Sequence, residues 1–316
     1  MTTGTGVHAA AGWAKEVTKN TRAVPTNFIG FVQESLTVNQ GFIRSAALGG
    51  GLRHTPRKSL GQKEVGGSIS FELQPETMID LFELMLGGAA ATTGTTPTYT
   101  HVFAGGDLAS GTFQVKRPMG ASNNQFDFVG SMVNQWTLAQ NPGEYATLAL
   151  DLFSYDMLTN QTAATYAADA SPTPLTFRHL TVSDIDVNTR CFDSLTLTGA
   201  NNLERSFKSC ATDAGRAVIR ENGRRTITGT VAGDFEDMDA VASYLAGTEG
   251  ALTVAWDAGT SAKVTLALNV FYTGAVPMVD GAGVVKQSIG FEAVVGDGNT
   301  DADAITVTIV STDSNA

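Results

Sequence analysis

The side chains that could do catalytic or metal chemistry are few in this sequence and are poorly grouped. Its four histidines show no metal-ligand spacing: His8, His54, His101 and His179. Cys191 and Cys210 lie 19 residues apart, with no Cys-x-x-Cys pair and no histidine pattern beside them. We therefore expect both cysteines to be inert, reduced thiols. His179 is interpreted as a strand or loop residue rather than a ligand.

Sequence motifs for nucleophilic catalysis and nucleotide binding are also missing. The sequence contains neither Gly-x-Ser-x-Gly nor the phosphate-binding Gly-x-x-x-x-Gly-Lys-Ser/Thr pattern. Two acidic clusters, Asp234–Asp237 and Asp297–Asp303, could bind calcium weakly, but they lack EF-hand spacing. We expect no catalytic residues, no cofactor and no resident metal. A hydrolase on a β scaffold is a further class, but the sequence lacks a hydrolase motif.

The chemistry that the sequence does concentrate is positive charge. Residues 44–63 carry a net charge of +5 and residues 205–225 a net charge of +4, whereas the chain as a whole carries −11, so the remainder carries −20. Both windows are rich in Gly, Ser and Arg and poor in periodic apolar residues, which predicts one long basic loop in each half of the chain. The candidate binding residues are Arg44, Arg53, Arg57, Lys58, Lys63, Arg205, Lys208, Arg216, Arg220, Arg224 and Arg225.

Three interpretations of these basic loops remain open. They could be solvated and flexible, or they could contact nucleic acid, although aromatic residues for base stacking are almost absent from them. The third interpretation, which we favour, is self-assembly. A basic loop is complementary to the acidic body of an identical subunit, and such head-to-tail contacts close into rings or grow into filaments.

Composition excludes several broad classes of protein. The 316 residues are 42% hydrophobic and only 16% charged, with 34 glycines and a pI of about 4.7. A disordered chain, a cationic nucleic-acid binder and a disulfide scaffold are each inconsistent with these values. No apolar run of membrane-spanning length and no secretory leader is present, so we expect a chain folded in the cytosol without a membrane span.

The elements expected to position the charged residues are mainly strands. Ser68–Leu73, Thr147–Leu152 and Lys263–Leu268 alternate apolar and small polar residues, which is typical of antiparallel strands with one buried face. Only Pro75–Leu86 and Asp237–Ala246 have a helical pattern, and glycine follows each of them. We expect a mainly β protein with an N-terminal arm (1–27), a first domain (28–155), a linker (156–174) and a second domain (175–316).

The two predicted domains share an internal repeat. Val65–Leu73 aligns with Ile227–Phe235 at an offset of 162 residues, and a helical segment follows both copies at an offset of 160. Upstream, Glu34–Val38 matches Asp193–Leu197 at an offset of 159. The same order of strand, basic loop, strand and helix therefore occurs twice, which indicates a duplication.

In this arrangement the chain resembles the two-domain tail tube proteins, or major tail proteins, of long-tailed bacteriophages. The resemblance is carried by Gly12–Thr21, with the pattern G-x-x-x-E-x-T, by Val65–Gly87, and by Gly223–Met238 with the C-terminal strands to Val294. It implies two tandem β-sandwich or half-barrel domains, each with one flanking helix. It also implies that sheets of neighbouring subunits join edge to edge into a closed inner barrel.

The resemblance further implies a structural virion protein rather than an enzyme. Three duplicated subunits would form a ring that imitates a six-membered one, and the long basic loops would contact the next ring. Its partners would be further copies of itself and the tape measure, tail-tip and tail terminator proteins, with assembly in the host cytoplasm. Genomic DNA would pass through the tube without specific binding.

Two further expectations concern the strand faces. We expect the small polar faces to line the lumen, where an acidic wall would repel phosphates. The alternative function is another β-rich phage surface or decoration protein, or a carbohydrate-binding module, which would expose clustered aromatics. Trp13, Trp136 and Trp256 are far apart in the sequence, and the last two lie in alternating segments, so we expect them in the core.

Overall fold

The computed structural model describes most of the chain: residues 4–47, 53–54, 57–119, 122–159, 161–166, 173–183, 189–190, 192–208, 215–279, 281–296, 300 and 304–314. The elements of the first half are η1 (Gly6–His8), β1 (Ala10–Lys15), β2 (Asn27–Ile29), β3 (Phe31–Glu34), β4 (Thr37–Arg44), β5 (Lys58–Glu72), α1 (Ile79–Leu86), β6 (Ala91–Thr95), β7 (Thr98–Ala104), β8 (Gly111–Met119), β9 (Ser122–Gln140), β10 (Thr147–Ser154) and β11 (Asp156–Thr159).

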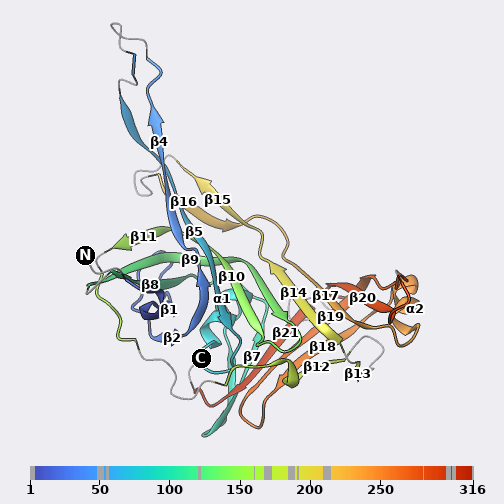
Figure 1. Cartoon of the computed structure of the whole chain (residues 1–316). Coiled ribbons are helices and arrows are strands. Elements are labelled where there is room, and N and C mark those ends of the chain that lie inside the picture. Colours follow the sequence, from blue (N-terminus) through green and yellow to red (C-terminus); the bar gives the residue numbers. More distant parts are fainter. Residues whose placement is uncertain are drawn as a thin grey trace.

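The elements of the second half are η2 (Phe177–His179), β12 (Leu180–Ser183), β13 (Thr189–Arg190), β14 (Phe192–Ala200), β15 (Leu203–Phe207), β16 (Ala217–Glu221), β17 (Thr226–Asp234), α2 (Asp239–Ala246), β18 (Glu249–Asp257), β19 (Lys263–Gly274), β20 (Lys286–Ala293) and β21 (Ile305–Ser311). Among the described residues, strands dominate both halves and one α-helix lies in each half (Figure 1). The prediction of a mainly β fold with one helix in each half is therefore confirmed.

Strand pairing repeats between the halves. In the first half β1 pairs with β8, β8 with β9, β9 with β10, β10 with β5, and β5 with β3 and β4. The second half has the same succession of pairs: β12 pairs with β18, β18 with β19, β19 with β20, β20 with β17, and β17 with β14. Two halves with this common order agree with the repeat found in the sequence.

One sheet runs through both halves of the molecule. The second part of β9 pairs with β10 on one side and with β14 of the second half on the other. All pairs are antiparallel, and the succession is β3/β4, β5, β10, β9, β14, β17, β20, β19. We call this the continuous sheet, and the β9–β14 pairing is its joint.

The two long strands β9 and β19 connect the continuous sheet to a second layer in each half. The first part of β9 pairs with β8 and β11, and the first part of β19 pairs with β18 and β21. Gly130, with a φ of 64°, lies where β9 changes partners; a left-handed residue there turns the strand. A second contact between the halves is the pairing of β21 with β7.

A hydrophobic core fills the space between the layers and extends through both halves. Trp13, Trp136 and Trp256 are 0–2% exposed, which confirms the expectation for the last two. None of the three tryptophans is therefore available to stack on a sugar. The strands of the continuous sheet alternate as predicted: Thr147–Ser154 has every second side chain fully buried.

Both helices begin later than the sequence predicted. α1 begins at Ile79 rather than Pro75, because Thr77 has a φ of 66° and so cannot belong to a right-handed helix. α2 begins at Asp239 rather than Asp237. Both helix ends are as predicted, since Gly87 and Gly247 are left-handed C-terminal caps.

The segment predicted as an N-terminal arm supplies a strand to the first half. β1 pairs with β8 along its whole length, and its Trp13 packs against Phe71 and Phe113. The buried Glu16 carboxylate accepts hydrogen bonds from the Ser110 and Thr112 hydroxyls at 2.7 Å and from backbone N–H groups of Asn20 and Gly130. Glu16 is the acid of the G-x-x-x-E-x-T pattern, so this motif anchors the arm to the bend in β9.

Each predicted basic loop is shorter than its basic window. The ends of each window lie in a β-hairpin, β4 with β5 in the first and β15 with β16 in the second, whereas the described residues between the paired strands are in no strand. Figure 1 shows β4 and the first part of β5 projecting from the body as a two-stranded ribbon. Such a ribbon has solvent on both faces, so it needs no apolar alternation, and the pattern that reveals a half-buried strand is missing.

The packing of the joint should depend on Gly199, which lies beneath the ring of Trp136. A Cβ at Gly199 would lie 2.1 Å from the Trp136 ring, so Gly199→Ala should destabilise the protein by about 1–3 kcal/mol through overpacking. Thermal unfolding followed by circular dichroism measures this. Gly30→Ala is the matched control, since nothing lies within 4 Å of its added Cβ. Equal unfolding temperatures for the two variants would contradict close packing at the joint.

Candidate assembly surfaces

The polar face of the continuous sheet is one candidate surface. Its side chains are small and polar where the opposite face is apolar: Ser68 and Ser70 on β5, Thr147 and Ala149 on β10, Thr137 on β9, Thr196 and Thr198 on β14, and Thr228 and Thr230 on β17. The face crosses the joint without interruption, since the Thr137 and Thr198 hydroxyl oxygens lie 3.4 Å apart.

Charge on this face is mainly acidic. Glu72, Asp151, Asp234 and Glu292 stand on it by strand alternation, together with Lys286. Lys286 binds Asp193 at 2.7 Å and Asp234 at 2.5 Å, and these hydrogen bonds raise its pKa to about 12. The four acids on this face outnumber Lys286, which is itself paired with two acids, so the face keeps a net negative charge.

The ribbon of β4 and β5 carries a mixed basic and apolar surface. Phe42, Ile43 and Leu60 are 54–71% exposed, and the Lys58 ammonium lies 5.3 Å from the centre of the Phe42 ring. Arg44 and Arg57 are exposed beside them. Exposed apolar side chains flanked by cations are typical of a surface that contacts another protein.

The second basic window folds back onto the first. The Lys63 N–H donates to the Gly215 carbonyl at 3.0 Å, and Lys63 forms an isolated bridge with Arg216. The Asp156 carboxylate, 6% exposed, binds the Lys63 ammonium and also the Arg216 guanidinium, the latter at 2.7 Å. One carboxylate therefore binds a cation from each hairpin and holds the two hairpins together.

Arg205 also serves this internal contact. Its guanidinium stacks 3.8 Å from the Phe153 ring centre and donates to the Val65 carbonyl at 3.0 Å. Burial lowers the pKa of Arg205 from its ordinary value, partly offset by Glu64 and Asp151. The Arg205 side chain thus packs β15 against the first half of the chain.

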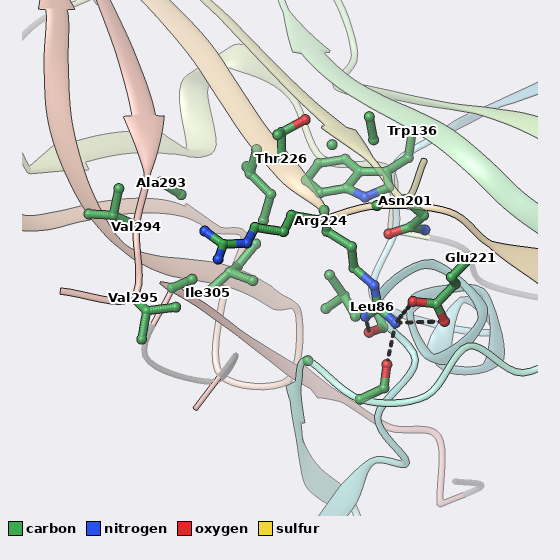
Figure 2. Close-up of a pocket in the computed structure, with 18 of the residues that line it drawn as sticks. Leu86, Trp136, Asn201, Glu221, Arg224, Thr226, Ala293, Val294, Val295 and Ile305 are labelled. Carbon is green, nitrogen blue, oxygen red and sulfur yellow. Dashed lines mark hydrogen bonds and ion pairs between the residues drawn. The ribbon is translucent and has the colours of Figure 1, made fainter. Parts of the chain in front are cut away.

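Arg225 joins the second half to the end of α1. Its guanidinium donates to the Leu86 carbonyl at 2.9 Å, to the Gly106 carbonyl at 2.6 Å and to Glu221 at 3.1 Å. Asn201 donates to the Met85 carbonyl at 3.0 Å. Figure 2 shows the hydrogen bonds to the Leu86 carbonyl and the Glu221 carboxylate at one side of a cavity of about 520 Å³, where the Arg224 side chain points away from Glu221. The last carbonyls of α1 are thereby satisfied across the joint.

The predicted binding residues therefore divide into two groups. Lys63, Arg205, Arg216, Arg220 and Arg225 bind acids or carbonyls within the chain, Arg220 through Glu204 at 3.1 Å. The second group is exposed and forms no ion pair with a described residue: Arg44, Arg53, Arg57, Lys58, Lys208 and Arg224. The second group is the one available to another molecule.

Comparison with known proteins then identifies the family. The family model described as "Phage tail tube protein" matches residues 6–293. The chain belongs to the phage tail tube protein family. The expected resemblance is confirmed, and the chain is a structural component of a phage-type tail.

Two other comparisons add less. One solved chain, from the structure "Virion of native gene transfer agent (GTA) particle", shares 14% identity with this tail tube chain. The match covers 38% of this chain and 93% of that one, with a TM-score of 0.31. No curated protein matches.

Several features were invisible to sequence reasoning. Asp156 has no neighbouring signal that marks it as the shared partner of Lys63 and Arg216.

Cys191 and Cys210 fall outside the described residues, as does most of the acidic cluster Asp297–Asp303. His179 ends the short helix η2, where its ring nitrogen Nδ1 accepts from the Thr176 N–H at 3.2 Å.

In the described part of this tail tube chain, no three His, Cys, Asp or Glu side chains are grouped to hold a metal ion. The described helices include none long and apolar enough to span a membrane.

Removing the shared acid should loosen the second hairpin. Asp156→Ala leaves Lys63 and Arg216 without their partner, and since both cations can reach water, we expect a loss of about 1–3 kcal/mol. Urea unfolding measures the loss, and hydrogen exchange should rise in β15 and β16. The control is Asp257→Ala, which breaks an exposed, solvent-screened pair with Lys263 and should leave the stability nearly unchanged. Unchanged exchange in β15 and β16 would contradict the role of Asp156.

Proposed function

We propose that this chain assembles with itself into three-membered rings that stack into a hollow tail tube, through which phage DNA passes. The observation that carries the proposal is the continuous sheet, which crosses both halves and keeps one apolar and one small polar face. Membership of the tail tube family supports the same assembly. No catalysis is part of this function.

Ring formation addresses the exposed edges of the continuous sheet. An open sheet presents unpaired backbone groups at both edges, and closure into a barrel removes them. The two halves of one chain already form two consecutive sectors of such a sheet. Three chains would then supply six equivalent sectors, so a three-membered ring would imitate a six-membered one.

Stacking of rings is assigned to the ribbon of β4 and β5. It projects from the body and carries cations that no described residue neutralises, with exposed Phe42, Ile43 and Leu60 among them. An adjacent ring offers an acidic surface, because the chain outside the two basic windows carries −20. Apolar burial would supply most of the affinity, and charge would orient the approach.

The lumen is assigned to the polar face of the continuous sheet. Small Ser and Thr side chains give a smooth wall, and the acidic excess repels DNA phosphates, so the duplex slides without binding. Assembly would take place in the host cytoplasm, with tape measure, tail-tip and tail terminator proteins setting the length and ends of the tube.

Reversing charge on the ribbon should stop tube growth without unfolding the chain. Arg57→Glu with Lys58→Glu should give a folded protein with an unchanged unfolding temperature that no longer forms tubes in negative-stain electron micrographs. The matched control reverses Arg178 and Lys263, two cations away from the ribbon, and should form normal tubes. Tubes of ordinary length from the Arg57 and Lys58 variant would refute the stacking role.

Reversing charge on the polar face should slow DNA passage. Glu72→Lys with Glu292→Lys puts cations on the proposed wall, and each contact with phosphate adds salt-dependent friction. The ejection time of phage particles that carry the variant should lengthen, most strongly at low salt. Asp257→Lys, outside this face, is the control. Ejection as fast as with the unaltered protein would rule out this wall as the lumen.

A further inference from the structure

Two edges of the continuous sheet end without a partner strand in the described structure. At one edge, β3 and β4 pair only with β5. At the other, β18 pairs with β19 as far as Phe271, and no described strand continues beyond it on that side. The following residues, Ala275–Val279, lie outside any strand.

The joint shows how the same kind of edge is paired inside one chain. Thr137 lies opposite Thr198, and Leu138 lies opposite Leu197. Trp136 and Leu138 point into the core, and Trp136 covers Gly199. Trp256 of the second half donates to the Gln140 side chain at 3.2 Å. The edge of β9 is therefore a specific, well-packed pairing surface.

Ala275–Val279 occupies the place in the second half that Trp136–Gln140 occupies in the first. β10 pairs with β9 so that Leu150 lies opposite Trp136. β20 is the repeat of β10, and its Gly290 lies opposite Gly274, so continuing this register puts Ile289 opposite Ala275. Gln287 already donates to the Ala275 carbonyl at 2.7 Å.

The burial pattern of Ala275–Val279 is that of an edge strand that has no partner strand in the described structure. Ala275 is 1% exposed, whereas Val276 and Met278 are 59% and 82% exposed, with Pro277 between them partly buried. This alternation matches Trp136 to Ala139, where residues 136 and 138 are buried. Pro277 lacks an N–H, and proline is one of the residues that keep a free edge from pairing indiscriminately.

The equivalent of β14 is the free edge of β3 and β4. Thr198 lies opposite Thr228 of β17, and Thr37 lies opposite Gly66 of β5. Thr228 and Gly66 correspond at the repeat offset of 162 residues, so Thr37 takes the place of Thr198. This strand pairing sets the offset of the upstream strand at 161 residues and corrects the offset of 159 that the sequence match of Glu34–Val38 suggested. Thr37 is exposed and the preceding Leu36 is 1% exposed, as Thr198 follows the buried Leu197.

We propose that Ala275–Val279 pairs antiparallel with Glu34–Val38 of a second copy of this chain, in the register of the joint. Val276 then lies opposite Thr37, as Thr137 lies opposite Thr198. The inference rests on the proposed ring, for which it supplies the interface. Each chain has one edge of each kind, so the contact is head-to-tail and closes a ring of identical copies.

Cysteine cross-linking tests both the partner and the register. In a chain with Cys191 and Cys210 replaced by serine, Thr37→Cys and Val276→Cys are introduced together, and assembled particles are oxidised. Directly opposite residues in an antiparallel pair lie close enough for a disulfide. The expected result is depletion of the monomer band and a ladder of covalent multimers that ends at the ring size.

Two control pairs make the outcome specific. Thr137→Cys with Thr198→Cys spans the joint and should cross-link within one chain, giving no ladder. Asn39→Cys with Val276→Cys is displaced by two residues on the same face and should cross-link far less. Ladders that are stronger for the displaced pair, or absent while rings are visible, would overturn the inference and leave the proposed function standing.

A substitution without cysteine provides an independent check. Val276→Asp puts a charge at the proposed interface and should leave unfolding unchanged while abolishing rings. Val17→Asp, at a fully exposed valine outside this edge, should leave rings intact. Rings formed as readily by Val276→Asp would contradict the interface. If the unaltered chain gives no rings or tubes at any concentration, the proposed function fails, and this interface fails with it.

Discussion

The main-chain pairing of β9 with β14 is the interaction on which the rest of the structure depends. It turns two similar half-barrels into one sheet with a single apolar and a single polar face. The contacts around it secure that pairing: Trp136 packs over Gly199, and Asn201 and Arg225 satisfy the last carbonyls of α1. An antiparallel sheet that continues across a repeat boundary can continue across a subunit boundary by the same geometry.

The duplication explains why one edge is paired and its equivalent is free. Within the chain, β14 follows the first half closely enough to pair with it. The last edge of the second half meets no described strand beyond Phe271, and Val276 and Met278 are exposed there. The continuous sheet built from the two halves therefore ends in two edges that no described strand pairs, and the proposed ring would fill them with further copies of the chain.

The sequence predicted the strands and helix ends well, because alternation and glycine caps are local signals. Thr147–Leu152 and Gly247 are examples. It did not show that the ends of the basic windows are strands, since a solvated ribbon such as β4 with β5 has no buried face to impose a pattern. It also missed the partners of Lys63, Arg205 and Arg216, because Asp156 and Phe153 meet them only through packing between the halves. The ribbon cations that remain exposed were predicted from composition alone.

The most direct test of the central claim is electron cryomicroscopy of the purified chain, imaged across a concentration series. The account predicts hollow tubes with three chains in each ring, a closed inner sheet and the Thr137 and Thr198 face toward the lumen. Tubes with an open inner sheet, or with the apolar face of β10 and β14 toward the channel, would contradict it.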